Sequence, residues 1–264
     1  MNNDKEIIII PHSIREKKDV EIQKNNRRVK VRLLFDGMHP SNINEDPFIF
    51  NECYLYSFCH ANNVITKELE NKYREKEVYL IFVSFESMDE CSNSDKRHIY
   101  IDTVIKVDKI IEYAEKYKRT EENIGNELSN YFSESSVARI IACHFPEIND
   151  GELSQHDTQR LRTIIGDRMK SFIPLKKCGE KFSYEYEPYR LDEKLSCKIK
   201  ELICGSEKNY RYYVAKKSSP RIIEDKCKLK KFKDVETFVL NNLLVEDNNI
   251  LKLRGKDLKG EYDR

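Results

Sequence analysis

At 264 residues the chain is long enough for one large domain or two modest ones, and its 10 % aromatic content is not that of a disordered chain. The 47 Lys and Arg residues nearly cancel the 46 Asp and Glu residues, so any affinity for nucleic acid or a membrane must come from local segregation of charge. The N-terminus lacks the pattern of a secretory signal, and no window approaches the roughly 18 apolar residues that span a bilayer, so we expect a soluble, cytoplasmic protein that does not bind membranes.

Strand patterns crowd the first 110 residues. A continuous apolar run at 78–83 is typical of a central strand, and 98–107 alternates over part of its length. Shorter strand patterns cover 7–10, 29–35, 48–50 and 53–58. The highly charged stretch 16–26 favours an exposed connection or a short helix, and 66–74 favours a helix with Thr66 as N-cap.

Helical patterns predominate after this point. They cover 109–118, 120–145 with a break near 133–136, 158–165, 193–204 and 234–244. An extended segment is expected at 169–174 and a last strand at 250–253. The segregation of strands from helices predicts an α+β fold rather than a doubly wound α/β fold.

The predicted architecture is a small, mainly antiparallel barrel or curved sheet with helices packed around it. Residues 1–145 are expected to form its strand-rich, barrel-like part. Residues 146–254 would form a helical, more basic part of the same domain or a second small domain, and 255–264 a tail. No internal repeat and no proline- or glycine-rich linker separates these parts.

The cysteine spacing argues against a metal site. The eight cysteines form no CxxC pair and show none of the short ligand spacings of a zinc site. The motifs HExxH, GxGxxG and GxxxxGK[ST] are absent as well. We therefore expect free thiols, no metal and no cofactor.

A polar and aromatic cluster lies at the end of the predicted strand 53–58, where Cys59 precedes His60. Neighbouring residues of a strand point to opposite faces, so these two do not form a dyad with each other. Cys59 is a candidate nucleophile if a distant histidine, His98 or His144, serves as its base. The alternative is a packed strand end without chemistry.

Asp102 lies inside the 98–107 strand pattern, between Ile101 and Thr103. A carboxylate buried without a partner costs several kcal/mol, so Asp102 needs a partner or a role. Strict alternation places it on the face of Tyr100 and Val104. If that face lines a cavity, Asp102 is a candidate catalytic residue or an acceptor for a bound base or sugar; if it meets water, it is ordinary surface.

Positive charge is concentrated at 208–233. This segment contains ten Lys and Arg residues and two acidic residues, Glu224 and Asp225, an excess of eight positive charges. Cations neutralise phosphates and aromatic rings stack on unpaired bases, so this composition favours nucleic-acid binding. A solvated lysine-rich surface is the alternative. The candidate binding residues are Arg211, Tyr212, Lys216, Lys217, Lys230 and Lys231.

Several short motifs between about residues 47 and 190 resemble an uncharacterised bacterial family. They are Tyr56-Ser57-Phe58-Cys59, Phe82-Val83-Ser84, Ile101-Asp102-Thr103-Val104 and Met169-Lys170-Ser171-Phe172-Ile173-Pro174. Their layout is also similar to the nucleotide modification associated domains and to PUA/ASCH-like barrels. The chain departs from the family at Val83, in place of a glycine, and at Ala61, in place of a glutamine.

This resemblance implies a PUA/ASCH-like barrel that recognises or modifies nucleic acid or a modified nucleotide, in a bacterial or phage nucleotide-modification or antiviral defence context. It implies a ligand pocket lined by Tyr56, Ser57, Ser84, Thr103 and Ser171, together with Cys59 and Asp102. Two alternatives stay open. One is an enzyme, a transferase or hydrolase, with Cys59 as nucleophile; the other is a protein–protein interaction module.

Overall fold

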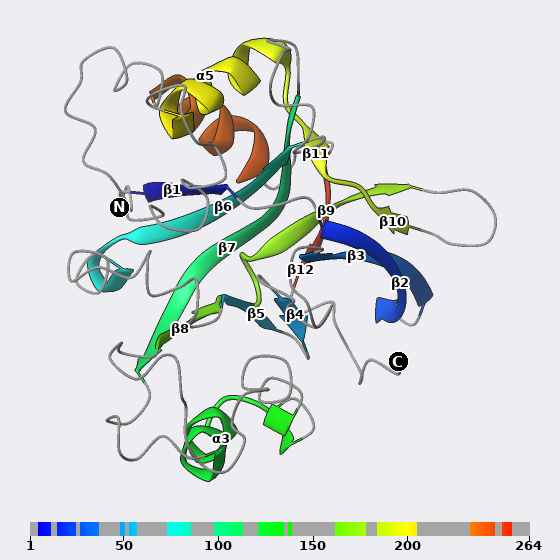
Figure 1. Ribbon diagram of the computed structural model, residues 1–264, viewed down its shortest axis with the longest axis vertical. Coiled ribbons are helices and arrows are strands. Elements are labelled where there is room, and N and C mark those ends of the chain that lie inside the picture. Colours follow the sequence, from blue (N-terminus) through cyan, green and yellow to red (C-terminus); the bar gives the residue numbers. More distant parts are fainter. Residues whose placement is uncertain are drawn as a thin grey trace.

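The structure is a computed structural model in which a curved sheet forms the centre of the molecule (Figure 1). Helix α5 (Glu193–Cys204) and the C-terminal helix (residues 233–243) lie on one side of the sheet, and α3 (Glu121–Ser129) lies beyond its other end. The structure describes residues 5–11, 15–24, 27–36, 48–50, 53–56, 73–85, 98–112, 121–134, 137–138, 162–177, 184–204, 233–245 and 250–254.

Within the described residues, ten strands form the main sheet. Its principal order is β1 (Lys5–Pro11), β6 (Glu77–Phe85), β7 (Ile99–Glu112), β8 (Arg162–Gly166), β5 (Cys53–Tyr56) and β4 (Phe48–Phe50). The strands β9 (Phe172–Lys177), β10 (Tyr184–Tyr186), β11 (Tyr189–Arg190) and β12 (Leu251–Arg254) extend it beside β7. All pairs are antiparallel except β1 with β6. With its helices, the molecule is therefore an α+β protein, as the sequence predicts.

The strand β6 is the centre of the sheet, as its continuous apolar run predicts. It pairs with β1 on one edge and β7 on the other. Val78, Leu80 and Phe82 join an inner core that contains residues from both ends of the sheet. Residues 79, 81 and 83 join an outer core beneath the helices. Because both faces of β6 are buried, its central run 78–83 is apolar at every position rather than alternating.

The strand β7 is longer than its sequence pattern predicts and continues to Glu112, so the helix expected from residue 109 is wrong for residues 109–112. Two register shifts interrupt its pairing, at Asp102 opposite β6 and at Asp108 opposite β8. Each inserts one residue that has no counterpart on the partner strand, and such β-bulges bend a strand. The bent strand pairs first with β6 and then with β8, and so belongs to both halves of the sheet (Figure 1).

Two further expectations are corrected by strand pairing. The helix predicted at 158–165 is wrong where it overlaps β8, because Thr163, Ile164 and Ile165 are buried between β7 and β5. The charged stretch 16–26 is neither a connection nor a helix up to Lys24. It forms β2 (Arg15–Lys24), which pairs with β3 (Arg27–Asp36) in a hairpin beside β10. In both cases cross-strand pairing decides the structure, and single-residue propensity does not.

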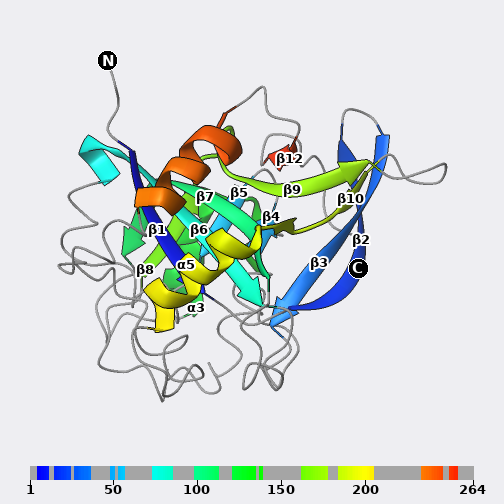
Figure 2. The ribbon, with the colours of Figure 1, turned by 90° about the horizontal axis from the view of Figure 1, so that it is seen from above.

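The helices predicted at 193–204 and 234–244 are confirmed. Asp192 accepts a hydrogen bond from the Leu195 amide (2.8 Å) and caps α5 (Glu193–Cys204). The C-terminal helix ends in a π-helical turn, η2 (Val239–Leu243). Both helices cover the outer face of the sheet (Figure 2) through Leu195, Ile199, Val235, Val239 and Leu243.

A third helix, α3 (Glu121–Ser129), lies within the region expected to be helical from 120 to 145. None of the helices in the described ranges combines the length and the apolarity that a membrane crossing requires. Strands from residues 1–145 and 146–254 share one sheet, and β12, predicted as the last strand, pairs with β9 inside it. The C-terminal strand therefore completes a sheet that begins at Lys5.

Candidate functional site

Three of the predicted pocket residues lie together where β6 meets β7. Ser84 is opposite Tyr100 and Thr103 is opposite Phe82, while Asp102 is the inserted residue of the first bulge. All three side chains are buried. Thr103 shares the inner face with Phe82, because directly opposed residues of an antiparallel pair point to the same side.

The bulge at Asp102 also changes which residues share a face. Strict alternation would group Asp102 with Val104, yet Val104 belongs to the outer core together with Ile99 and Ile101. The inserted residue therefore reverses the phase of the strand after position 102, and the face expected for Val104 is wrong. Counted from Ile101, Asp102 lies on the inner side.

Tyr56 and Ser171 lie near this region, Tyr56 on β5 and Ser171 in the turn just before β9. The Tyr56 ring packs edge-on against Phe82, with ring centroids 4.9 Å apart. Ser171 is fully buried, and its hydroxyl oxygen accepts a hydrogen bond from the Lys106 amide at 3.1 Å. Tyr56 thus packs in the inner core, and Ser171 holds the backbone of β7 just before its second bulge.

The remaining predicted site residues lie outside the described ranges. These are Ser57, Cys59, Arg211, Tyr212, Lys216, Lys217, Lys230 and Lys231. The convergence of Cys59 with Ser84 and Asp102 therefore stays a prediction. Of the cysteines, Cys197 is partly exposed on α5 and forms no disulfide with another described residue.

An ion-pair cluster surrounds the turn between β8 and β9. Asp167 accepts hydrogen bonds from the amides of Met169 and Lys170 and forms an ion pair with Lys106 at 3.6 Å. The Lys170 ammonium contacts the Glu77 carboxylate, whose side chain is 13 % exposed. Burial alone would raise the pKa of Glu77, but the hydrogen bond and charge of Lys170, assisted by Lys5 and Lys106, lower it below its ordinary value.

This lowered pKa makes the Glu77 contribution to stability pH-dependent. A depressed carboxyl pKa stabilises the fold above the pKa of the unfolded chain, and that contribution is lost as the pH falls through the folded-state pKa. We expect Glu77→Gln to lower the free energy of unfolding by about 0.5–1 kcal/mol at pH 7, with the difference from wild type shrinking below about pH 4. Urea unfolding at a series of pH values measures this difference, and Lys170→Gln should reproduce it. A difference that stays constant down to pH 3 would contradict it.

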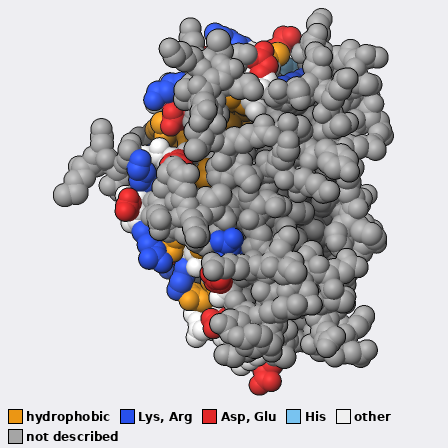
Figure 3. Space-filling view, turned by 60° about the vertical axis from the view of Figure 1, so that its left-hand side comes forward, with side chains coloured by type: hydrophobic (Ala, Val, Ile, Leu, Met, Phe, Trp, Pro, Cys, Tyr) orange, Lys and Arg blue, Asp and Glu red, His pale blue; other side chains and the backbone are white. Residues whose placement is uncertain are grey.

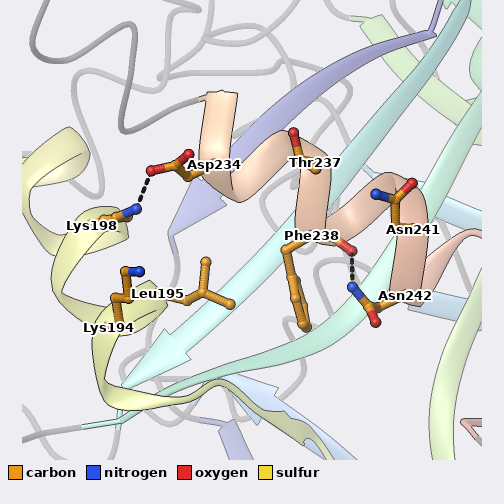
Figure 4. A pocket seen from close by; sticks show the side chains of 8 residues that line it. All are labelled: Lys194, Leu195, Lys198, Asp234, Thr237, Phe238, Asn241 and Asn242. Carbon is orange, nitrogen blue, oxygen red and sulfur yellow. Dashed lines mark hydrogen bonds and ion pairs between the residues drawn. The ribbon is translucent and has the colours of Figure 1, made fainter.

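A groove lies between α5 and the C-terminal helix (Figure 4). Its volume is about 360 Å³, and the Lys198–Asp234 ion pair joins the two helices beside it. Leu195 and Phe238 supply its apolar lining. The polar lining consists of Lys194, Lys198, Asp234, Thr237, Asn241 and Asn242.

The groove offers an aromatic ring, amides and a lysine at one place. Phe238 is half-buried and packs against Tyr189 of β11, with ring centroids 5.9 Å apart. Asn242 donates a hydrogen bond to the Phe238 carbonyl at 3.0 Å, whereas Asn241 is exposed. Sequence reasoning missed the lining residues because each is an ordinary polar or apolar residue of an amphipathic helix, and their juxtaposition depends on how two distant helices pack.

The comparisons with known proteins supply no family for this chain. No family model matches it, and the searches of curated proteins and of solved structures found no match either. Among the side chains that the structure describes, no group of three or more His, Cys, Asp or Glu residues is arranged to hold a metal ion.

Proposed function

We propose that this protein binds nucleic acid, using the basic segment 208–233 and the helical layer from which that segment extends. The observation that carries the proposal is where the segment begins and ends. It begins four residues after Cys204, the last residue of α5, and ends at Lys233, the first residue of the C-terminal helix. These two helices lie side by side over the outer face of the sheet (Figure 2), so the chain enters the segment shortly after one helix of this layer and leaves it at the other.

The distribution of charge supports this proposal. The whole chain carries +1 and the segment carries +8, so the remaining residues carry −7. In the view of Figure 3, Lys and Arg alternate with Asp and Glu over the described surface, and neither sign dominates it. A local cationic segment on an otherwise acidic protein attracts phosphates to one place, and aromatic residues within it add base stacking.

The proposal also includes a specific type of fold and a specific class of ligand. We infer a barrel of the PUA/ASCH-like kind that is not fully closed, since β1 and β4 end the order of the described strands and do not pair with each other. Two observations support this inference. The strand β7 bends at two bulges, and strands from both halves of the sheet enclose the inner core. Nucleic acid that carries a modified nucleotide, in a bacterial or phage defence setting, is the ligand class that this fold and the sequence motifs favour.

A salt titration of binding tests the proposal. Labelled single- and double-stranded DNA and RNA are titrated with wild type, with Lys216→Glu/Lys217→Glu, and with the fourfold variant that also carries Lys230→Glu and Lys231→Glu. We expect log K to fall linearly with log salt, with a slope of about −0.9 per phosphate on duplex and −0.7 on single strands. The fourfold variant should bind at least tenfold more weakly and with a flatter slope, because it makes fewer phosphate contacts.

The matched control is Lys176→Glu/Lys177→Glu, an adjacent lysine pair that is exposed on β9. It changes the net charge as much as the Lys216 and Lys217 pair does, but at another place. We expect it to leave affinity and slope close to wild type. Equal weakening by both pairs would reduce the effect to net charge, and no binding by wild type at low salt would overturn the proposal.

A further inference from the structure

We propose that the groove between α5 and the C-terminal helix is a pocket for one unpaired nucleobase of the bound strand. This inference rests on the proposed function and adds the site at which that function would select its ligand. The groove is lined entirely by described residues of the two helices that hold the basic segment (Figure 4). Its volume of about 360 Å³ is at the lower end of the range for small-ligand pockets, about 300–1,000 Å³.

The charge of the groove favours a base over a run of phosphates. Asp234 is the carboxylate of the lining, and Lys198 forms an ion pair with it. Lys194, one turn earlier on α5, is exposed and can meet one phosphate next to the base. Two lysines and one aspartate leave a single net positive charge, so the phosphates of a longer strand must be held elsewhere.

The uncharged lining has the chemistry that a nucleobase requires. Bases stack on aromatic rings and are read along their edges by groups that both donate and accept hydrogen bonds. Phe238 provides a ring whose position is fixed by Tyr189. The Asn241 amide offers a donor beside an acceptor, the pairing that matches the N6 and N7 edge of adenine.

The π-helical turn explains why Asn241 is available. An α-helix has 3.6 residues per turn, so apolar residues spaced by four drift around it. The wider turn, closed by the Leu244 amide on the Val239 carbonyl (3.0 Å), keeps Val235, Val239 and Leu243 in the outer core. Asn242 bonds to the helix backbone, and Asn241 remains exposed at the groove.

Titration with adenosine monophosphate tests this pocket apart from the basic segment. We expect wild type to bind the nucleotide, and Asn241→Ala and the isosteric Asn241→Asp each to weaken that binding about tenfold. The matched control Asn126→Ala, an exposed asparagine on α3, should bind as wild type does. Lys216→Glu/Lys217→Glu should also retain nucleotide binding while losing affinity for oligonucleotides.

The outcomes separate the two proposals. If wild type binds oligonucleotides with the expected salt slope but both Asn241 variants bind adenosine monophosphate as wild type does, the base pocket is wrong and the proposed function stands. The same holds if wild type binds oligonucleotides but not the mononucleotide at millimolar concentration. If wild type binds no oligonucleotide at low salt, the proposed function itself fails, and the pocket fails with it.

Discussion

Phe82→Ala should lower the free energy of unfolding by about 3–5 kcal/mol, the usual cost of removing a large aromatic side chain from a packed core. Phe82 is fully buried in the middle of the central strand and lies opposite Thr103, beside the first bulge of β7. Its ring also packs edge-on against Tyr56, and such pairs add about 0.5–1.5 kcal/mol beyond burial. Urea unfolding monitored by far-UV circular dichroism measures the loss.

Phe82→Leu is the matched comparison, since leucine keeps most of the apolar volume at the same position. We expect it to cost clearly less than the alanine variant, about 1–1.5 kcal/mol. The series also bears on the ligand pocket predicted around Tyr56, Ser84 and Thr103. If that region held an open, water-filled cavity, truncating Phe82 would enlarge it at little cost, so a loss below about 1 kcal/mol would contradict the packed core.

The sequence predicts β6 well because its apolar run leaves one physical solution. The six consecutive apolar residues 78–83 place apolar side chains on both faces and suit a strand that is covered on both sides. The helix α5 is also predicted well. An aspartate cap marks its start, an amphipathic pattern covers its length, and a glycine after Cys204 marks its end. In these two elements the local sequence pattern and the tertiary packing favour the same secondary structure.

The extent of β7 could not be predicted, because a β-bulge has no sequence pattern of its own. Asp102 and Asp108 each shift the alternation by one residue, so apolar positions after them fall out of phase with those before. The neighbours Ile110 and Ile111 then fit a helical pattern as well as a strand paired with β8. Pairing with a strand more than fifty residues away along the sequence decides between the two.

The candidate site was predictable in its residues but not in their role. The sequence left open whether Asp102 is buried or on the surface, and the structure buries it together with Ser84, Thr103 and Ser171. The pattern does not tell whether such a group meets a ligand or the backbone. The groove at Asn241 depends on packing between helices that are separated by the whole segment 205–232, which no local pattern encodes.

Gly166 lies close to Ser171 beside β7, where β8 turns into β9. A Cβ atom added at Gly166 would lie 2.6 Å from the Ser171 hydroxyl oxygen and 2.9 Å from Ile105 Cγ2. Both neighbours belong to buried side chains that have no open space to move into. We therefore expect Gly166→Ala to lower the free energy of unfolding by about 1–3 kcal/mol, the usual cost of overpacking a core.

A double-mutant cycle with Ser171→Ala tests the contact itself. Ser171→Ala alone should cost about 1–2 kcal/mol, because the Lys106 amide loses the hydroxyl oxygen that accepts its hydrogen bond. It also removes the atom nearest to the added Cβ, so the double variant should be more stable than the sum of the single losses by at least about 0.5 kcal/mol. Strict additivity would contradict the clash between residues 166 and 171 and leave Ile105 and Tyr54, whose Cβ would lie 3.1 Å from the added atom, as the cause of any loss. The coupling energy, measured by urea unfolding of the four proteins, decides whether Ser171 is the neighbour that clashes.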